Sequence, residues 1–555
     1  MDGYSETSVA DRSKRNGDVL AFVQPLKLED GTLYELAYRF SKAYKDVAAN
    51  SLEQFFPTGV TRLPTGKETG NYLAAYVGLY YLRVAFIDLL GESVPPGDPK
   101  RQNVRRTLEK AWRIEERLKR DNAKDLFAWI GDCVAEVVAD NLDRLGDSPP
   151  ELEMGISFCF PMKQKSINEA ILMPTGKGFA LASDLDLRQA LLDGYERHTR
   201  RPDDELDPTP AKRHKGHALP KLRIAAITND TVATLASLAY SVKSLPNTRV
   251  VMGLIVGAGC NSTIPMKLDD LHESKVRHIR THNPSAVETL VSTEWTLNAS
   301  SLPLKECGII TKWDKHLDEH CDRPGFQPLE YMVGGRYIGE LVRIITCDFF
   351  TSELNISRDA LPQNLVKQNG LTTDFLSLVV AGPRPSDESL VVELSQKFPP
   401  PSPSQWKWTP ESASILRTIA SAVQTRSAAL VAAATVGLLA CAGEIRLTEP
   451  ENLGSRPRRI GETQLLENGK PAIPHQSNWL RGPEELVVAF SGGVIQHYPG
   501  YKNNVQKFID RILLHGGPQD GGKSIFLREV SDGGIVGVGV LAGTAAGKIE
   551  RIIGV

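Results

Sequence analysis

Two neighbouring polar residues, Asn229 and Asp230, stand where the sequence could place catalytic or ligand-binding groups. An apolar run that begins at Leu222 predicts a buried strand, which ends at these residues, and a helix is expected to begin directly behind them. An amide and a carboxylate at such a turn could bind a ligand or exchange a proton, but the same pair is also a common helix N-cap. From these residues alone, the N-cap is the simpler interpretation.

Glycine-rich segments are the second feature with chemical meaning, because glycine lets a backbone approach a phosphate group closely. Such segments lie at 257–259 and at 533–539. The segment near the C-terminus is a weak signal, since an isolated glycine-rich stretch more often forms a turn into a packed helix.

Two basic clusters lie close together in a charged, proline-containing segment. Arg197, Arg200 and Arg201 are separated by residues 202–211 from the run 212–215, which reads Lys-Arg-His-Lys. This spacing resembles a two-part nuclear import signal, and a solvated charged loop is an equally good interpretation. Direct nucleic-acid binding is not expected, because no helix-turn-helix, zinc spacing or broad basic face accompanies the clusters.

The composition is that of an ordinary globular protein. The 555 residues are 41% hydrophobic and 24% charged, and 65 basic against 67 acidic residues leave a formal net charge of -2. The length corresponds to three or four domains of about 150 residues, or to two larger units. The charge balance excludes a wholly basic nucleic-acid coat and an acidic disordered chain.

Neither a membrane span nor a metal site is expected. The longest apolar run, 428–443, is shorter than the roughly 20 residues of a span and predicts a buried helix. The N-terminal residues lack the apolar core of a secretory signal, and the seven cysteines are scattered without a Cys-x-x-Cys pair. We therefore expect an intracellular protein.

Strands and helices are expected to alternate along the chain. After a loose N-terminus of about 30 residues, Thr32 can cap a first helix, and apolar runs within 71–90 predict a hairpin around Gly78. Charged helices are expected at about 102–120 and 125–143. This alternation predicts an α/β fold.

Eight segments resemble the hexokinase family in the order that the family uses. Together they cover nearly the whole chain from about residue 30, and so many chance matches in the correct order are implausible. The segments are LPTGKETGNYL (63–73), LRVAFIDLLG (82–91), SFCFPMKQKSINEAIL (157–172), KGFA (177–180), ITNDTVATL (227–235), GLIVGAG (253–259), STEW (292–295) and PGFQPLEYMVGGRYIGELVR (324–343).

This resemblance implies a two-lobed α/β hexokinase fold of the actin-like ATPase (ribonuclease H-like) class. A sugar would lie between the lobes and ATP across the mouth of the cleft. The implied divisions are a flexible N-terminus at 1–30, a large lobe at 31–70 and 224–530, a small lobe at 71–223, a C-terminal segment at 531–555 that returns toward the small lobe, a basic insertion at 197–217 and a polar insertion at 446–483.

The resemblance also assigns roles to polar residues. Asp230 falls on the position of the catalytic base, and Asn229 beside it falls on a sugar-binding position. Transfer of a phosphoryl group to a sugar hydroxyl needs such a base, donors that fix the sugar and a magnesium-phosphate cradle. The other expected sugar contacts are Lys177, Asn261, Glu294 and Glu330.

Two further sugar contacts of the family are altered. Gly176 stands where the family has a threonine beside the lysine, and Cys159 stands where it has serine or threonine. A thiol is a weaker donor and acceptor than a hydroxyl. Two lost hydrogen bonds of about 1 kcal/mol each would weaken hexose binding roughly tenfold to a hundredfold.

The first phosphate loop departs furthest from the family. The family pattern is Asp-x-Gly-Gly-Thr-Asn-x-Arg, and residues 76–83 read Tyr-Val-Gly-Leu-Tyr-Tyr-Leu-Arg. Gly78 and Arg83 remain, but Tyr76 replaces the carboxylate suited to Mg²⁺, which prefers anionic oxygen ligands. Leu79, Tyr80 and Tyr81 add side chains where the triphosphate needs space and N–H donors, although the aromatic residues also suit one face of a β-hairpin.

The second phosphate loop is eroded as well. Residues 257–262 keep Gly257 and Gly259 but lose both threonine hydroxyls of the family pattern. The segment VAFSGGVIQHYPGY (488–501) resembles the hairpin on the adenosine side, with Gly492 as an expected nucleotide contact. Some nucleotide affinity is therefore expected, and ATP and Mg²⁺ are the cofactors if the chain is active.

These losses predict a non-catalytic or very weak sugar kinase. Removal of one charge-stabilising group typically costs about 3 to 4 kcal/mol in the transition state, and at least three are missing. The pattern resembles the atypical fungal hexokinases that regulate secreted hydrolases during carbon starvation. It implies a hexose ligand, a regulatory protein partner and a location in the nucleus or cytoplasm.

Two alternatives stay open at this point. The first is an active ATP-dependent hexokinase that phosphorylates a hexose or an amino sugar at the 6-hydroxyl, which the retained Asp230 supports. The second is an interaction protein that binds neither a hexose nor a nucleotide.

Overall fold

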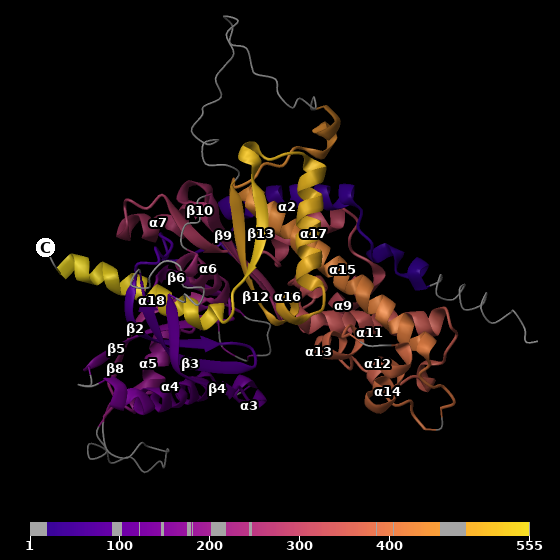
Figure 1. Ribbon diagram of the computed structural model, residues 1–555, viewed down its shortest axis with the longest axis horizontal. Coiled ribbons are helices and arrows are strands. Elements are labelled where there is room, and N and C mark those ends of the chain that lie inside the picture. The colour runs from indigo at the N-terminus through magenta and orange to yellow at the C-terminus, as the bar shows by residue number, and fades with distance from the viewer. Residues whose placement is uncertain are drawn as a thin grey trace, which may run out of the picture.

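Two lobes, each with its own sheet and hydrophobic core, make up the computed structural model (Figure 1). It describes residues 19–91, 103–120, 122–145, 149–174, 179, 181, 183–200, 218–242, 247–383, 386–402, 404–455 and 484–553.

The small lobe is built on a mixed sheet. In the described chain this sheet has five strands in the order β4-β3-β2-β5-β8, with β2, β5 and β8 parallel. The middle residues of β5 and β8 are buried, as expected for parallel strands that are covered on both faces. The elements of this lobe are β2 Thr69–Val77, β3 Tyr81–Leu90, β4 Val104–Arg113, α3 Glu116–Arg120, α4 Ala123–Leu145, β5 Glu151–Phe158, β6 Met162–Ser166, β7 Glu169–Leu172, α5 Leu187–Glu196 and β8 Lys221–Asn229.

The large lobe holds a second mixed sheet, with six strands among the described residues, in the order β1-β11-β10-β9-β12-β13. Its strands are β1 Phe56–Pro57, β9 Thr248–Val256, β10 Cys260–Lys267, β11 Glu288–Ser292, β12 Glu485–Ser491 and β13 Ser524–Glu529. Its α-helices are α2 Asp30–Asn50, α7 Glu273–His282, α8 Ser301–Glu306, α9 Lys312–Glu319, α10 Glu330–Val333, α11 Gly335–Ser352, α12 Gln363–Val366, α13 Thr373–Phe375, α14 Asp387–Lys397, α15 Pro410–Cys441, α16 Gly493–His497 and α17 Tyr501–Gly516.

Two helices, α6 (Asp230–Ser241) and α18 (Gly533–Ile553), link the lobes through a third core that takes residues from both sheets. They pack together so closely that a Cβ at Gly537 would lie 1.7 Å from the carbonyl oxygen of Ala233. On its other side, α18 lies against β2, β3, β5 and β8 of the small lobe. The glycines of segment 533–539 thus serve helix packing, the simpler interpretation of that segment.

Helix α15 forms the centre of the large lobe. Thr409 and Ser412 form a capping box at its start, and its side chains are buried along most of its length. Its Arg426 makes a buried ion pair with Asp314 of α9, with N–O distances of 2.6 and 2.8 Å. Within the described residues, α15 is the one helix long and apolar enough to cross a membrane by length and composition, and most of its apolar stretch is buried inside the protein.

The free edge of the large sheet is covered by a side chain. Strand β13 pairs with β12 and lies at the end of the sheet. The Gln506 amide on α17 donates to the carbonyl oxygen of Ile525 over 2.8 Å and accepts from the N–H of Leu527 over 3.0 Å. This amide occupies the hydrogen-bonding groups that a further strand would use.

Three expectations from the sequence were wrong. Residues 104–113 form the edge strand β4 instead of part of a helix at 102–120. The first long helix begins at Asp30 with Glu29 as N-cap, so Thr32 lies inside it. Residues 19–29 are not loose, since Val19 and Leu26 are 2% exposed in the core of the large lobe.

The boundaries between the parts also differ from the expected ones. Strand β8 belongs wholly to the small-lobe sheet, so the chain enters the next part after Asn229 and not at residue 224. Residues 1–18 of the N-terminus, 201–217 of the basic insertion and 456–483 of the polar insertion lie outside the described residues.

Candidate functional site

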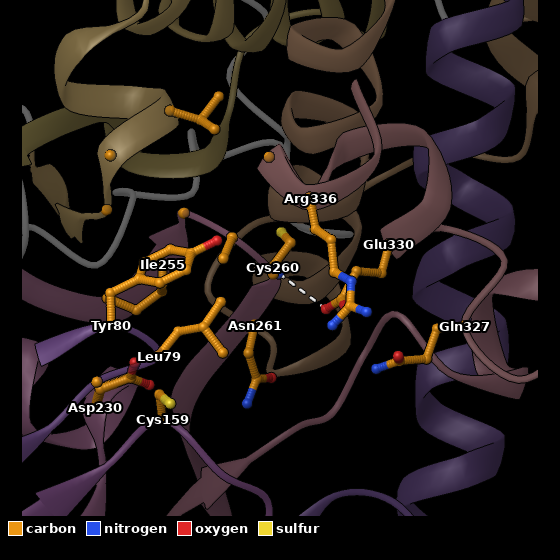
Figure 2. Close-up of a pocket in the computed structure, with 18 of the residues that line it drawn as sticks. Leu79, Tyr80, Cys159, Asp230, Ile255, Cys260, Asn261, Gln327, Glu330 and Arg336 are labelled. Atoms are coloured by element: carbon orange, nitrogen blue, oxygen red, sulfur yellow. Dashed lines mark hydrogen bonds between the residues drawn. The ribbon is translucent and has the colours of Figure 1, made fainter. Parts of the chain in front are cut away.

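A cleft of about 1310 Å³ lies where the two lobes meet (Figure 2). Residues from both lobes and from distant parts of the sequence line it. Those with an expected role are Tyr76, Gly78, Leu79, Tyr80, Arg83, Cys159, Asn229, Asp230, Gly257, Gly259, Asn261, Glu294, Glu330 and Gly492.

Asn229 and Asp230 stand at the junction of β8 and α6. The Asn229 Oδ1 atom accepts from the backbone N–H and the hydroxyl of Thr231, over 2.9 and 2.7 Å, and its Nδ2 donates to the carbonyl oxygen of Phe160 over 3.1 Å. Asn229 is therefore a helix N-cap and a cleft residue at once. Asp230, 8% exposed, is the first residue of α6, where the helix dipole favours a carboxylate.

Asn261 and Glu294 are joined by reciprocal hydrogen bonds. The Asn261 Nδ2 atom donates to Glu294 Oε1 over 2.7 Å, and the Glu294 N–H donates to Asn261 Oδ1 over 3.1 Å. Ser292 donates to the same carboxylate oxygen over 3.1 Å. The Glu294 carboxylate is thus fixed in direction before any ligand arrives, which reduces the entropy lost on binding.

Glu330 begins the short helix α10 on the large-lobe side. Its carboxylate accepts from the backbone N–H of Cys260 over 3.0 Å, the dashed line in Figure 2, and it is 4% exposed. Asp230, Asn261, Glu294 and Glu330 therefore line one cleft, which agrees with the positions that the resemblance implied, and their contact with a sugar stays a prediction. Lys177 and Gly176 lie outside the described residues.

Tyr76, expected from the resemblance at the position of the family's magnesium-binding carboxylate, packs its aromatic ring against two glycines. A Cβ at Gly78 would lie 3.1 Å from its ring, and a Cβ at Gly534 would lie 2.8 Å from it. The ring therefore packs between the first phosphate loop and the first turn of α18. Burial, and then the negative charge of Asp230, raise the pKa of the Tyr76 phenol well above its usual value, so it stays neutral.

The other side chains of the expected first phosphate loop also occupy space in the cleft or bond to neighbouring residues. Figure 2 shows Leu79 and Tyr80 projecting into the cleft near Ile255. Arg83 donates to Asp532 over 2.5 Å and pairs with Glu109, and the same two carboxylates also bind Arg106. The Arg83 guanidinium is thus held in an ion-pair cluster that ties β3 and β4 to the start of α18.

The expected second phosphate loop, residues 257–262, is hydrogen-bonded through its carbonyl oxygens to the start of α11. The carbonyl oxygens of Gly257 and Ala258 accept from the N–H groups of Gly335 and Arg336 over 2.7 and 3.0 Å. The first N–H groups of α11 are therefore already used. Gly492, with a φ of 118°, needs to be glycine because a Cβ there would lie 2.5 Å from the Val256 carbonyl oxygen.

The described residues do not fit a magnesium triphosphate. A neutral phenol stands at the position expected for the carboxylate, and Leu79 and Tyr80 line the same cleft. A Mg²⁺ site needs an oxygen-rich and usually anionic ligand set.

The sequence analysis missed two cleft residues. Arg336 lies beside Glu330 on the large-lobe side (Figure 2), and Gln54 lines the sugar end. Arg336 falls inside one of the family-like segments, where the cationic side chain itself was a signal. Gln54 stands in a loop that carries no motif, so the sequence offered no signal for it.

Comparison with known proteins agrees with the architecture of two lobes around a cleft. Hexokinase family models match residues 18–240 and 251–544. The chain has the two-lobed hexokinase fold, with mixed α/β sheets consistent with the actin-like ATPase class. It belongs to the hexokinase family.

Individual relatives have modest sequence identity to this chain. A hexokinase from Schistosoma mansoni is 31% identical over 339 residues, which cover 61% of this chain and 65% of the relative. A glucokinase from Aspergillus niger is 26% identical over 519 residues, covering 89% and 90%. The structure of the Schistosoma mansoni hexokinase complexed with glucose covers 96% of this chain and 99% of its own, with a TM-score of 0.69 and 23% identity.

Proposed function

We propose that the chain binds a hexose in its cleft, transfers phosphate very weakly or not at all, and acts as a regulator that responds to sugar. The observation that carries this proposal is the packing of the Tyr76 ring between Gly78 and Gly534. In this position the ring replaces a metal-binding carboxylate and covers the start of α18. Loss of several preorganised charge-stabilising groups should lower turnover by several decades.

Hexose binding is supported by four buried or half-buried polar side chains that line the cleft, those of Asp230, Asn261, Glu294 and Glu330. The relatives are hexokinases and a glucokinase, and one solved relative is complexed with glucose. Sugar binding could then close the lobes, provided the closed state has the higher affinity for the sugar.

The test is turnover of the purified chain with Mg-ATP and a panel of hexoses, beside a variant with Tyr76→Asp, Leu79→Gly, Tyr80→Thr and Tyr81→Asn. We expect no measurable turnover in the unaltered chain and a gain in the restored variant. Addition of Asp230→Ala to the restored variant should remove the gain, which makes it the matched control. Turnover of the unaltered chain at the rate of an ordinary hexokinase would refute the proposal.

An active hexokinase acting at the 6-hydroxyl of a hexose or an amino sugar is the second candidate. Its support is Asp230, which lies in the cleft at the first turn of α6. The same assay separates the two candidates, because activity in the unaltered chain would require another arrangement that holds the phosphates.

The regulatory role includes a protein partner and transcriptional control from the nucleus as proposals. Arg197 is paired with Asp132, and Arg200 with Glu196, so these two cations are engaged on α5 and α4. The import signal would then depend on residues 212–215. Replacement of Lys212, Arg213 and Lys215 by alanine in a fluorescent fusion should move the protein out of the nucleus, and an unchanged distribution would count against an import signal.

A further inference from the structure

Two non-glycine residues with left-handed backbone lie side by side at the sugar end of the cleft. Glu294 has a φ of 49° and Phe55 a φ of 53°. The Phe55 N–H donates to the carbonyl oxygen of Thr293 over 3.1 Å, which joins the two segments. Such conformations are uncommon for residues with a side chain, and they persist where the surrounding structure enforces them.

The Gln54 side chain bonds to the main chain at both ends of the turn that begins at Glu294. Its Nε2 atom donates to the carbonyl oxygen of Glu294 over 2.9 Å, and its Oε1 atom accepts from the Ala299 N–H over 3.1 Å. The side chain is 4% exposed, so both bonds lie away from competing water. One amide therefore spans the turn that begins at Glu294.

Lys275 of α7 holds the main chain of Gln54 from behind. Its Nζ atom donates to the Gln54 carbonyl oxygen over 3.0 Å, and the residue is 9% exposed. Helix α7 thus anchors the loop that carries Gln54. The carboxylate of Glu294 is fixed separately, by Asn261 and Ser292.

We infer that Gln54 is a positioning residue of the hexose site, which sets the turn at Glu294 so that the carboxylate faces the sugar. This inference rests on the proposed hexose binding. The bonds act at different atoms: Asn261 holds the carboxylate and the N–H of Glu294, and Gln54 holds its carbonyl oxygen and, through Ala299, the far end of the turn. Catalytic and binding geometries depend on such supporting contacts.

The test uses Gln54→Met, which keeps the volume of the side chain and removes both hydrogen bonds. We expect the Kd for glucose, measured by calorimetry, to rise about tenfold. Gln54→Glu keeps the acceptor for Ala299 and loses the donor to Glu294, so it should also weaken binding. Gln424→Met is the matched control, because Gln424 is equally buried at 4% exposure but lies on α15.

A double-mutant cycle distinguishes positioning from a general structural role. In a Glu294→Gln background, Gln54→Met should change the glucose Kd less than twofold, because the two residues act through one contact. A full tenfold effect in that background would overturn the inference, as would an unchanged Kd for Gln54→Met alone.

A crystal structure of the Gln54→Met variant tests the same inference without a bound sugar, because it shows the backbone conformation at Glu294 directly. We expect the turn at Glu294 to leave its left-handed conformation, and an unchanged turn would overturn the inference. If the unaltered chain binds no glucose, the proposed function fails, and the crystal structure still decides the role of Gln54.

Discussion

The hexose half and the phosphate half of the cleft differ in what their side chains do. In the half that we propose binds a hexose, Asp230, Asn261, Glu294 and Glu330 line the cleft, and hydrogen bonds to neighbouring groups hold the side chains of the last three. In the half expected to bind phosphate, the ring of Tyr76 packs against Gly78 of the expected first phosphate loop and against Gly534 of α18.

Under the proposed function, this difference is the way in which the cleft loses one ligand and keeps another. Backbone that approaches closely at glycines can accept either a phosphate or an aromatic ring, since both need the space that a Cβ would fill. Once the ring is in place, the same glycines contribute to folding stability. An aromatic ring could not take the place of the ligand in the hexose half in the same way. It would bury the carboxylates of that half without a polar ligand or water, which is costly.

The largest expected effect is on stability in the phosphate half. Tyr76→Ala should lower the free energy of unfolding by about 3 kcal/mol, as for other packed aromatic side chains, measured by urea denaturation. Tyr81→Ala is the control, since Tyr81 lies in the same hairpin with 53% exposure and should change stability little. If Tyr76→Ala and Tyr81→Ala lowered the free energy of unfolding equally, the Tyr76 ring would not have the special packing role assigned to it.

The second prediction concerns a charge behind the hexose half. Burial lowers the pKa of the Lys275 ammonium to about 8. Because the unfolded chain then binds this proton more tightly than the folded chain, the stability of the folded chain should rise as the pH increases from 8 to about 10.5. Relative to Lys275→Met, the gain should reach about 2 to 3 kcal/mol.

Urea unfolding of the two proteins at several pH values measures this gain. Lys305→Met is a control, because Lys305 of α8 is exposed. A constant difference in stability between the unaltered chain and Lys275→Met across the window would contradict the prediction.

The third prediction sharpens the contrast between ligands. Asp230→Ala should raise the Kd for glucose roughly tenfold to a hundredfold, because a hydrogen bond to a charged group contributes about 1.5 to 3 kcal/mol. Nucleotide affinity should be unchanged. Calorimetric titration of both ligands measures the effect, and a loss of nucleotide affinity alone would reverse the assignment of the halves.

The smallest effect is expected at Cys159, which stands beside Asp230 in Figure 2. Cys159→Ser should tighten glucose binding by about threefold to tenfold, since a hydroxyl is a stronger donor and acceptor than a thiol and a hydrogen bond is worth about 1 kcal/mol. Cys133→Ser, in the core of the small lobe, is the control. Weaker binding by Cys159→Ser would mean that the thiol does not face the sugar.

Features set by local patterns were predicted from the sequence. The hairpin around Gly78 and the strand that hands over to a helix at Asn229 both follow from apolar runs interrupted by small or polar residues. The error at 104–113 has a physical reason. Strand β4 lies at a half-exposed edge, so its charged residues lack the alternation that marks a buried strand.

The site was predicted as far as family-like segments reach. Cleft positions for Asp230, Asn261, Glu294 and Glu330 follow from the resemblance. The contact of Gln54 with Glu294 and the packing of Tyr76 on Gly534 join residues far apart in the chain. Such contacts depend on tertiary structure, which a single sequence does not reveal.

The amide of Gln506 has a consequence for the solubility of the whole chain. An uncovered edge of a sheet can recruit a strand from another molecule, which leads to aggregation. Here the Gln506 side chain occupies the outward hydrogen-bonding groups of Ile525 and Leu527 in β13. A strand from a second molecule therefore cannot pair with this part of the edge unless the amide moves away. A residue remote from the cleft thereby helps to set how concentrated the protein can become.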